Sequence, residues 1–142
     1  MKKKQAVLPS ILLACPDAAQ RRLMVKALVR RGHRVADYGD GGEVLAYLQG
    51  ATPALLVLDA NLPSLGGVEL CFRTKRVAQL KDVPVIVLAF AADTEAQARA
   101  ERGKADKVLT KPVTLEVLVA AVEDLLEPAG GVRLEAAVKP QS

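Results

Sequence analysis

The chain has 142 residues, of which 51% are hydrophobic, a length that suits one well-buried domain and is too short for two of ordinary size. Lysine and arginine outnumber aspartate and glutamate by 20 to 16, which gives a formal net charge of +4. With two Phe, two Tyr and no Trp, the chain offers neither a dense basic stripe nor stacking aromatics, so its composition argues against nucleic-acid binding.

The first fifteen residues combine a lysine-rich start with a short apolar run ending in Leu12-Leu13-Ala14-Cys15, as in a bacterial lipoprotein signal. Pro9 interrupts that run, and cleavage would remove a strand that the fold needs, so we favour a buried strand over residues 11–14. Cys15 and Cys71 are too few for a disulfide framework and lack zinc-ligand spacing, which favours a reducing, cytoplasmic location. No apolar stretch approaches the ~18 residues of a membrane span.

Two helices in the first half of the chain are predicted by capping boxes, in which an Asp is followed three residues later by Gln or Glu. The pairs are Asp17 with Gln20 and Asp40 with Glu43. They open helices through about residue 31, where Gly32 ends the first, and through about residue 49, with a short strand at 34–38 between them.

The first of these helices has an apolar side and an arginine-rich side. We expect Leu23, Ala27 and Leu28 to face the core and the arginines to face solvent. Val25 and Val29 extend the apolar side toward a possible partner. His33, in the turn that follows, is expected to be solvated.

The central stretch of the chain is the apolar run at residues 54–59, Ala-Leu-Leu-Val-Leu-Asp, which reads as a strand buried on both faces of a parallel sheet. Asp59 ends it. Open α/β sheets place their ligand crevice at the carboxyl ends of the strands, so a carboxylate there marks the candidate functional centre.

In the second half, a helix is predicted from Val68 to about residue 80, with an inward stripe of Val68, Cys71, Phe72 and Val77. A buried strand follows at 85–88, then a helix capped by Thr94 with Gln97 that ends near residue 102. The last strand, 107–110, leads through Lys111-Pro112 into a helix that ends near Leu126.

Strand and helix therefore alternate five times, which predicts an α/β domain: a three-layer, doubly wound, five-stranded parallel sheet with helices on both faces. We assign this domain to residues 1–127. Residues 128–142, rich in Gly and Pro and without a periodic pattern, are expected to form a flexible tail or linker.

Three segments follow one another at characteristic spacing: Leu56-Val57-Leu58-Asp59-Ala60-Asn61-Leu62-Pro63 with Gly66-Gly67, then Val83-Pro84-Val85-Ile86-Val87-Leu88, then Ala105-Asp106-Lys107-Val108-Leu109-Thr110-Lys111-Pro112. In this order and spacing they resemble a CheY-like receiver domain of two-component signalling, over about residues 10–126. The resemblance implies strand order 2-1-3-4-5, the flavodoxin-like arrangement, and a cis Lys111-Pro112 bond. It also implies a cytoplasmic phosphorelay protein whose partners are a histidine kinase, a phosphotransfer protein or an effector protein.

By this resemblance Asp59 is the phosphoacceptor and Lys111 the pocket lysine. The chemistry agrees, because a carboxylate can attack phosphorus when nearby positive charge offsets the charge of the transferring group. Lys111 ends the strand predicted two places from Asp59 on the same sheet edge, so we expect the two side chains to meet. The alternative is a pair that only neutralises two charges at the rim of the sheet.

Receivers also hold magnesium, through the acceptor, a backbone carbonyl at the position of Asn61, and two acidic residues that end the first strand. Cys15 and Pro16 occupy those two positions. Neither supplies the carboxylate oxygens that Mg²⁺ prefers. Asp17, one residue further on, is expected to cap its helix, with a metal role as the alternative. We therefore predict weak magnesium binding and weak or absent phosphorylation.

Two switch positions also depart from the family. Ala89 stands where receivers carry a hydroxyl at the end of the fourth strand, and Val108 stands where they carry an aromatic residue in the fifth. Phe90 is an aromatic neighbour, although we favour a packing role for it. Without the hydroxyl and the aromatic ring, the usual coupling between pocket and output face lacks its moving parts.

The leading hypothesis is a receiver domain that is phosphorylated at Asp59 and signals through protein contacts; self-phosphorylation would be its only catalysis. The alternative is a pseudo-receiver, an interaction module that works without phosphorylation. A flavodoxin-like enzyme or nucleotide binder is disfavoured, because residues 15–19 lack the glycine that close approach to a phosphate needs. A redox role for Cys15 requires a partly exposed, electropositive setting.

Overall fold

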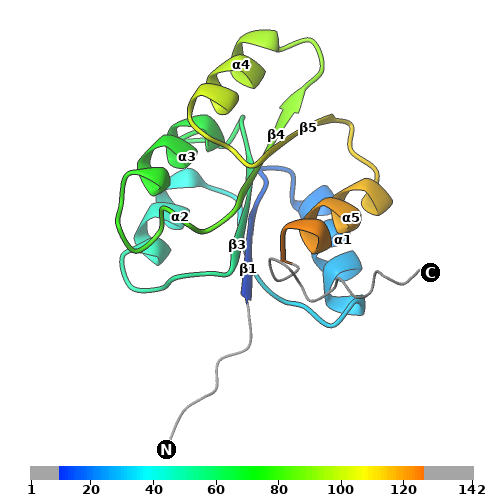
Figure 1. Ribbon diagram of the computed structural model, residues 1–142. Helices are drawn as coiled ribbons and strands as arrows, with labels where there is room; N and C mark the ends of the chain where they lie inside the picture. Colours follow the sequence, from blue (N-terminus) through cyan, green and yellow to red (C-terminus); the bar gives the residue numbers. More distant parts are fainter. Residues whose placement is uncertain (1–9, 127–142) are drawn as a thin grey trace, which may run out of the picture.

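A computed structural model describes residues 10–126. Five strands alternate with five helices along the chain (Figure 1). The strands are β1 (Ser10–Ala14), β2 (Arg34–Tyr38), β3 (Leu55–Asp59), β4 (Val85–Phe90) and β5 (Lys107–Lys111). The helices are α1 (Ala18–Arg30), α2 (Gly41–Leu48), α3 (Gly67–Lys75), α4 (Thr94–Arg102) and α5 (Leu115–Leu126). The tail predicted for residues 128–142 lies outside the described residues.

All neighbouring strands are parallel, and the sheet has the order β2-β1-β3-β4-β5, which confirms the predicted topology. Helices α2, α3 and α4 cover one face of the sheet, and α1 and α5 cover the other (Figure 1). Between residues 10 and 126 no helix is both long enough and apolar enough to cross a membrane.

The central strand β3 is buried along its whole length, as its uninterrupted apolar sequence predicts. Leu56 and Leu58 pack into the core beneath α2, α3 and α4, whereas Leu55 and Val57 pack into the core shared with α1 and α5. Each such side chain contributes about 1.5–3 kcal/mol by leaving water. Burial on both faces therefore fixes β3 at the centre of the sheet and sets Asp59 at its carboxyl end.

Two of the three predicted helix caps are confirmed. The Asp17 carboxylate accepts the Gln20 N–H at 3.0 Å, and the Asp40 carboxylate accepts the Glu43 N–H at 3.1 Å. The third was wrong by one residue: Asp93, rather than Thr94, caps α4 by accepting the Ala96 N–H. Asp is the stronger N-cap residue, and its choice places Thr94 inside the helix.

The buried side of α1 differs from the prediction. Leu28 is buried as expected and Ala27 is half-buried, but Leu23 is 56% exposed and Met24 is buried in its place. Residues four apart lie on one helix face, so Met24 shares the face of Leu28, whereas Leu23 is rotated toward solvent. Val29 is also exposed.

Helix α3 ends at Lys75, earlier than predicted. Its inward residues Val68 and Cys71 are buried as expected, but Val77 lies beyond the helix and is exposed. Beyond Lys75 the N–H groups of Arg76 and Val77 bond three residues back, and the Lys75 ammonium donates to the backbone carbonyl of Val83 at 2.9 Å in the turn that leads into β4.

The prediction of a solvated His33 was wrong. Its Nε2 lies 3.0 Å from a carboxylate oxygen of Glu123, on α5, which also accepts two hydrogen bonds from Arg31. This cluster joins the end of α1 to α5. The Arg31 guanidinium and His33 hold the pKa of Glu123 at about 2, below its usual 4.5, against a smaller opposing effect of burial.

Candidate functional site

Asp59 and Lys111 lie at the same edge of the sheet because they end parallel strands. Asp59 is in register with Leu88 of β4, and Lys111 is in register with Phe90 of the same strand. The Lys111 ammonium lies 2.8 Å from Oδ1 and 2.9 Å from Oδ2 of Asp59. The Lys111 side chain is 10% exposed and the Asp59 side chain is 3% exposed, so the pair is largely shielded from water. The structure brings together the two residues that the sequence analysis placed side by side.

Asn61 completes the contacts of this pair. Its backbone N–H donates to Oδ1 of Asp59 at 2.7 Å, and its side-chain oxygen accepts a hydrogen bond from Lys111 at 3.2 Å. From the sequence we expected only the backbone carbonyl of Asn61 to contribute, directed at a metal; the contact of its side chain with Lys111 was not predicted.

Phe90 also contacts Lys111, through its aromatic ring. The Lys111 ammonium lies 4.0 Å from the centroid of the ring, within the range of a cation–π interaction. Phe90 is 52% exposed and belongs to neither core cluster, so the packing role favoured for it was wrong. Phe90 and Lys111 are in register on β4 and β5, a pairing that the sequence alone does not give.

Residues 15 and 16, at the end of β1, supply no side-chain carboxylate. Cys15 is buried, and burial raises the pKa of its thiol above 9.0, so the group stays protonated near neutral pH. Pro16 has no donor oxygen in its side chain, and the Asp17 carboxylate caps α1 as predicted. Among residues 10–126 no three acidic, histidine or cysteine side chains are grouped as metal ligands would be.

Residues 15 and 16 therefore contribute none of the oxygen ligands that Mg²⁺ prefers in octahedral geometry. Cys15 is buried and protonated, so it lacks the partly exposed setting that a redox role would require.

Arg21 is a residue of this region that the sequence analysis treated as solvated. Its Nη1 donates to the backbone carbonyl of Cys15 at 2.7 Å, and its Nε pairs with Asp37 at 2.9 Å. A Cβ on Gly39 would lie 2.7 Å from the guanidinium, so the glycine makes room for it. A cation is thus held at the end of β1, where receivers place acids.

The two switch positions lie where the resemblance placed them. Ala89 is fully buried near the end of β4, and Val108 is half-buried in β5 against the same core. Ala89 has no hydroxyl to contact a phosphoryl group and Val108 has no ring to rotate. Both positions instead contribute to packing.

Comparisons with known proteins agree with this geometry. The protein-family model described as the response regulator receiver domain matches residues 11–123 of this chain. The chain is 39% identical over 120 residues to the transcriptional regulatory protein AfsQ1 of Streptomyces coelicolor, a match that covers 84% of this chain and 52% of the relative. It is 31% identical over 116 residues to the response regulator receiver protein CpdR of Brucella abortus, covering 82% of this chain and 95% of the relative.

Among solved structures, a receiver domain of a signal transduction histidine kinase from Syntrophus aciditrophicus superposes with a TM-score of 0.78 at 26% identity, covering 94% of this chain and 95% of that one. The chain spans about half the length of most of the curated relatives it matches. The predicted resemblance and topology are confirmed: the chain belongs to the receiver-domain family of two-component response regulators.

Proposed function

We propose that Asp59 is the phosphoacceptor of this receiver, that Lys111 supplies the positive charge for the transfer, and that transfer is slow because the magnesium ligands at residues 15 and 16 are missing. Receiver domains interact with histidine kinases or effector proteins, and bind magnesium in their acidic pocket. The proposed partners here are a cytoplasmic histidine kinase or phosphotransfer protein and an effector.

The observation that carries this proposal is the contact of one ammonium with both oxygens of a carboxylate that is 3% exposed. A carboxylate oxygen of Asp59 attacks phosphorus of a phosphohistidine, so an O–P bond forms as the P–N bond breaks. The electron pair leaves with the imidazole nitrogen, which takes a proton from water. Lys111 offsets the charge of the transferring group, the largest contribution that the pocket itself can make.

The test is phosphorylation by a small phosphodonor, phosphoramidate, followed by intact mass. We expect slow addition of one phosphoryl group, little dependence on magnesium, and no addition to the Asp59→Asn variant. Rapid, stoichiometric addition that requires magnesium would contradict the proposal, because it would show that the altered pocket still recruits the ion.

A second candidate function is a phosphorylation-independent interaction module. One feature of the pocket favours it: Ala89 and Val108 lack the hydroxyl and the aromatic ring that report phosphorylation in receivers. Replacing Asp59 by Asn in the producing cell separates the two functions. An unchanged signalling output supports the module, and a lost output supports the phosphoacceptor.

A further inference from the structure

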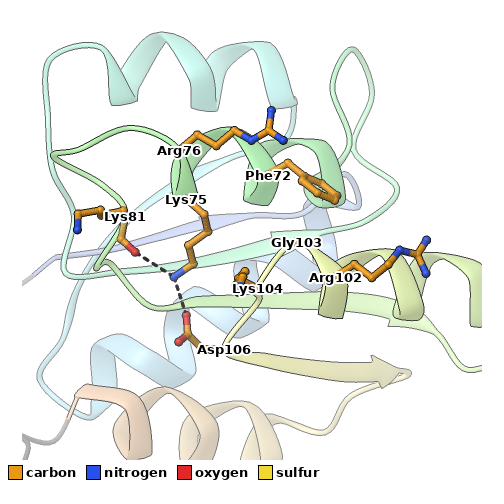
Figure 2. Close-up of a pocket in the computed structure, with 8 residues that line it drawn as sticks. All are labelled: Phe72, Lys75, Arg76, Lys81, Arg102, Gly103, Lys104 and Asp106. Carbon is orange, nitrogen blue, oxygen red and sulfur yellow. Dashed lines mark hydrogen bonds and ion pairs between the residues drawn. The ribbon is translucent and has the colours of Figure 1, made fainter.

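A basic cleft lies at the opposite edge of the sheet from Asp59, between the ends of α3 and α4 and the loops that lead into β4 and β5 (Figure 2). Its volume is about 500 Å³. Asp106 places the cleft at the amino ends of the strands, because its carboxylate accepts the N–H of Val85, the first residue of β4. Five cations line the cleft: Lys75, Arg76, Lys81, Arg102 and Lys104.

Only one of these cations is neutralised. Lys75 pairs with Asp106 at 2.9 Å and donates to the backbone carbonyl of Lys81, as Figure 2 shows, and it also donates to the backbone carbonyl of Val83. In the part of the chain that the structure describes, the other four form no ion pair, and Asp82 and Glu101, their neighbours in sequence, do not line the cleft. The lining residues therefore carry a formal charge of +4, as large as that of the entire chain.

The helix ends account for only part of these charges. Cations stabilise the C-terminus of a helix by offsetting its dipole, and Lys75 and Arg102 lie in such last turns. The last carbonyls of α4, however, already accept backbone N–H groups from the residues that follow. Lys81 and Lys104 lie in loops beyond the helices, so their charges have no such structural use.

Lys104 is held in a strained backbone conformation. Its φ is +74°, in the left-handed region that glycine adopts without steric cost and a lysine does not. Helices commonly end with a glycine or asparagine in this conformation. A lysine here costs stability relative to glycine, and it adds a fourth unpaired cation to the cleft.

We propose that this cleft binds a small molecule that carries two or more phosphate groups. Four unpaired cations around one hollow attract multiply charged anions, and arginine and lysine are the side chains that bind phosphate oxygens. A volume of about 500 Å³ is that of a small-molecule site. A nucleic acid would require a longer basic surface, with stacking aromatics that the cleft lacks apart from Phe72.

The test is calorimetric titration of the full chain, in magnesium-free buffer of low ionic strength, with inorganic tripolyphosphate and separately with ATP. We expect both to bind, and to bind more weakly as salt shortens the screening length from about 30 Å at 0.01 M to about 8 Å at 0.15 M. Equal affinities show that the phosphate chain suffices, and a tighter ATP complex shows that the base adds contacts. Both results support the proposal.

Two variants separate binding from folding. Lys104→Gly removes a cation and the left-handed strain together, so it should raise the unfolding temperature while weakening tripolyphosphate binding roughly tenfold. Arg76→Gln with Arg102→Gln removes one cation from each wall and should abolish binding.

The matched control is Arg22→Gln with Arg30→Gln, which removes two exposed arginines from α1 and lowers the net charge equally. It should retain binding. The proposal is overturned if the control loses as much affinity as the cleft pair, if neither phosphate compound binds at low salt, or if duplex DNA binds more tightly than tripolyphosphate.

Discussion

Rebuilding the acidic pair tests the central interpretation of the pocket. Ala14 is in register with Leu58, so residue 15 follows β1 at the same edge where Asp59 ends β3. The double variant Cys15→Asp, Pro16→Asp places at least one new carboxylate beside Asp59. Neighbouring strands lie about 5 Å apart, and two charges at that distance repel by roughly 3 kcal/mol at an effective dielectric constant near 20.

Lys111 offsets part of this repulsion, so without metal we expect the rebuilt variant to be roughly 1–3 kcal/mol less stable than the wild type. Magnesium should reverse the loss. A ligand that binds only the folded state adds about 2.7 kcal/mol when its concentration is one hundred times its dissociation constant. Urea unfolding with and without magnesium measures both effects, and intact mass after phosphoramidate treatment measures the accompanying gain in phosphorylation.

The matched control is Cys15→Ser, Pro16→Ser, which changes the same positions without adding charge and should remain insensitive to magnesium. The interpretation is refuted if magnesium stabilises the wild type as much as the rebuilt variant. It is equally refuted if the rebuilt variant folds but shows no response to magnesium in either stability or phosphorylation.

Three further predictions concern stability in urea unfolding. Lys111→Met should cost about 3–5 kcal/mol because it leaves the Asp59 carboxylate buried and unpaired, whereas adding Asp59→Asn should recover part of the loss; additive effects would contradict a coupled pair. Glu123 gains its stabilisation from a pKa lowered to about 2, mainly by Arg31, so Glu123→Gln should reduce stability above about pH 4.5, and the difference should vanish as pH falls toward 2. A pH-independent difference would contradict this assignment. Gly41→Ala should cost roughly 1–3 kcal/mol, because its Cβ would overlap a backbone carbonyl of the β3–α3 loop; an unchanged midpoint would refute the clash.

The fold was predictable because its signals are local in sequence. The buried run at residues 55–58 has no polar residue on either face and is bounded by turn residues, which predicts a central strand of a covered parallel sheet. Asp17 and Asp40 predict the starts of their helices, because each carboxylate accepts the backbone N–H of the residue three positions later. Errors arose where neighbours offered two similar choices, as with Leu23 and Met24 on α1 or Asp93 and Thr94 at α4.

The site was predictable only in part, because its side-chain contacts join distant segments. The meeting of Asp59 with Lys111 follows from parallel strands ending at one edge, so topology alone anticipates it. The contact of Phe90 with Lys111 depends instead on the pairing register, and that of Arg21 with the Cys15 carbonyl depends on the rotamer of a long side chain. No periodicity in the sequence carries that information.

The acid–lysine pocket and the basic cleft share one helix, which raises the question of whether they communicate. Helix α3 begins at Gly67, where a Cβ would lie 2.5 Å from the Asp59 carbonyl oxygen, and its last residue, Lys75, lines the cleft. Coupling requires an element with two arrangements that both sites bias, and it must act equally in both directions. In receivers a hydroxyl and an aromatic ring provide such an element, and this chain has Ala89 and Val108 at those two positions. We therefore expect saturating tripolyphosphate to leave the phosphorylation rate of Asp59 unchanged when the donor is phosphoramidate; a changed rate would show that α3 itself moves between two positions.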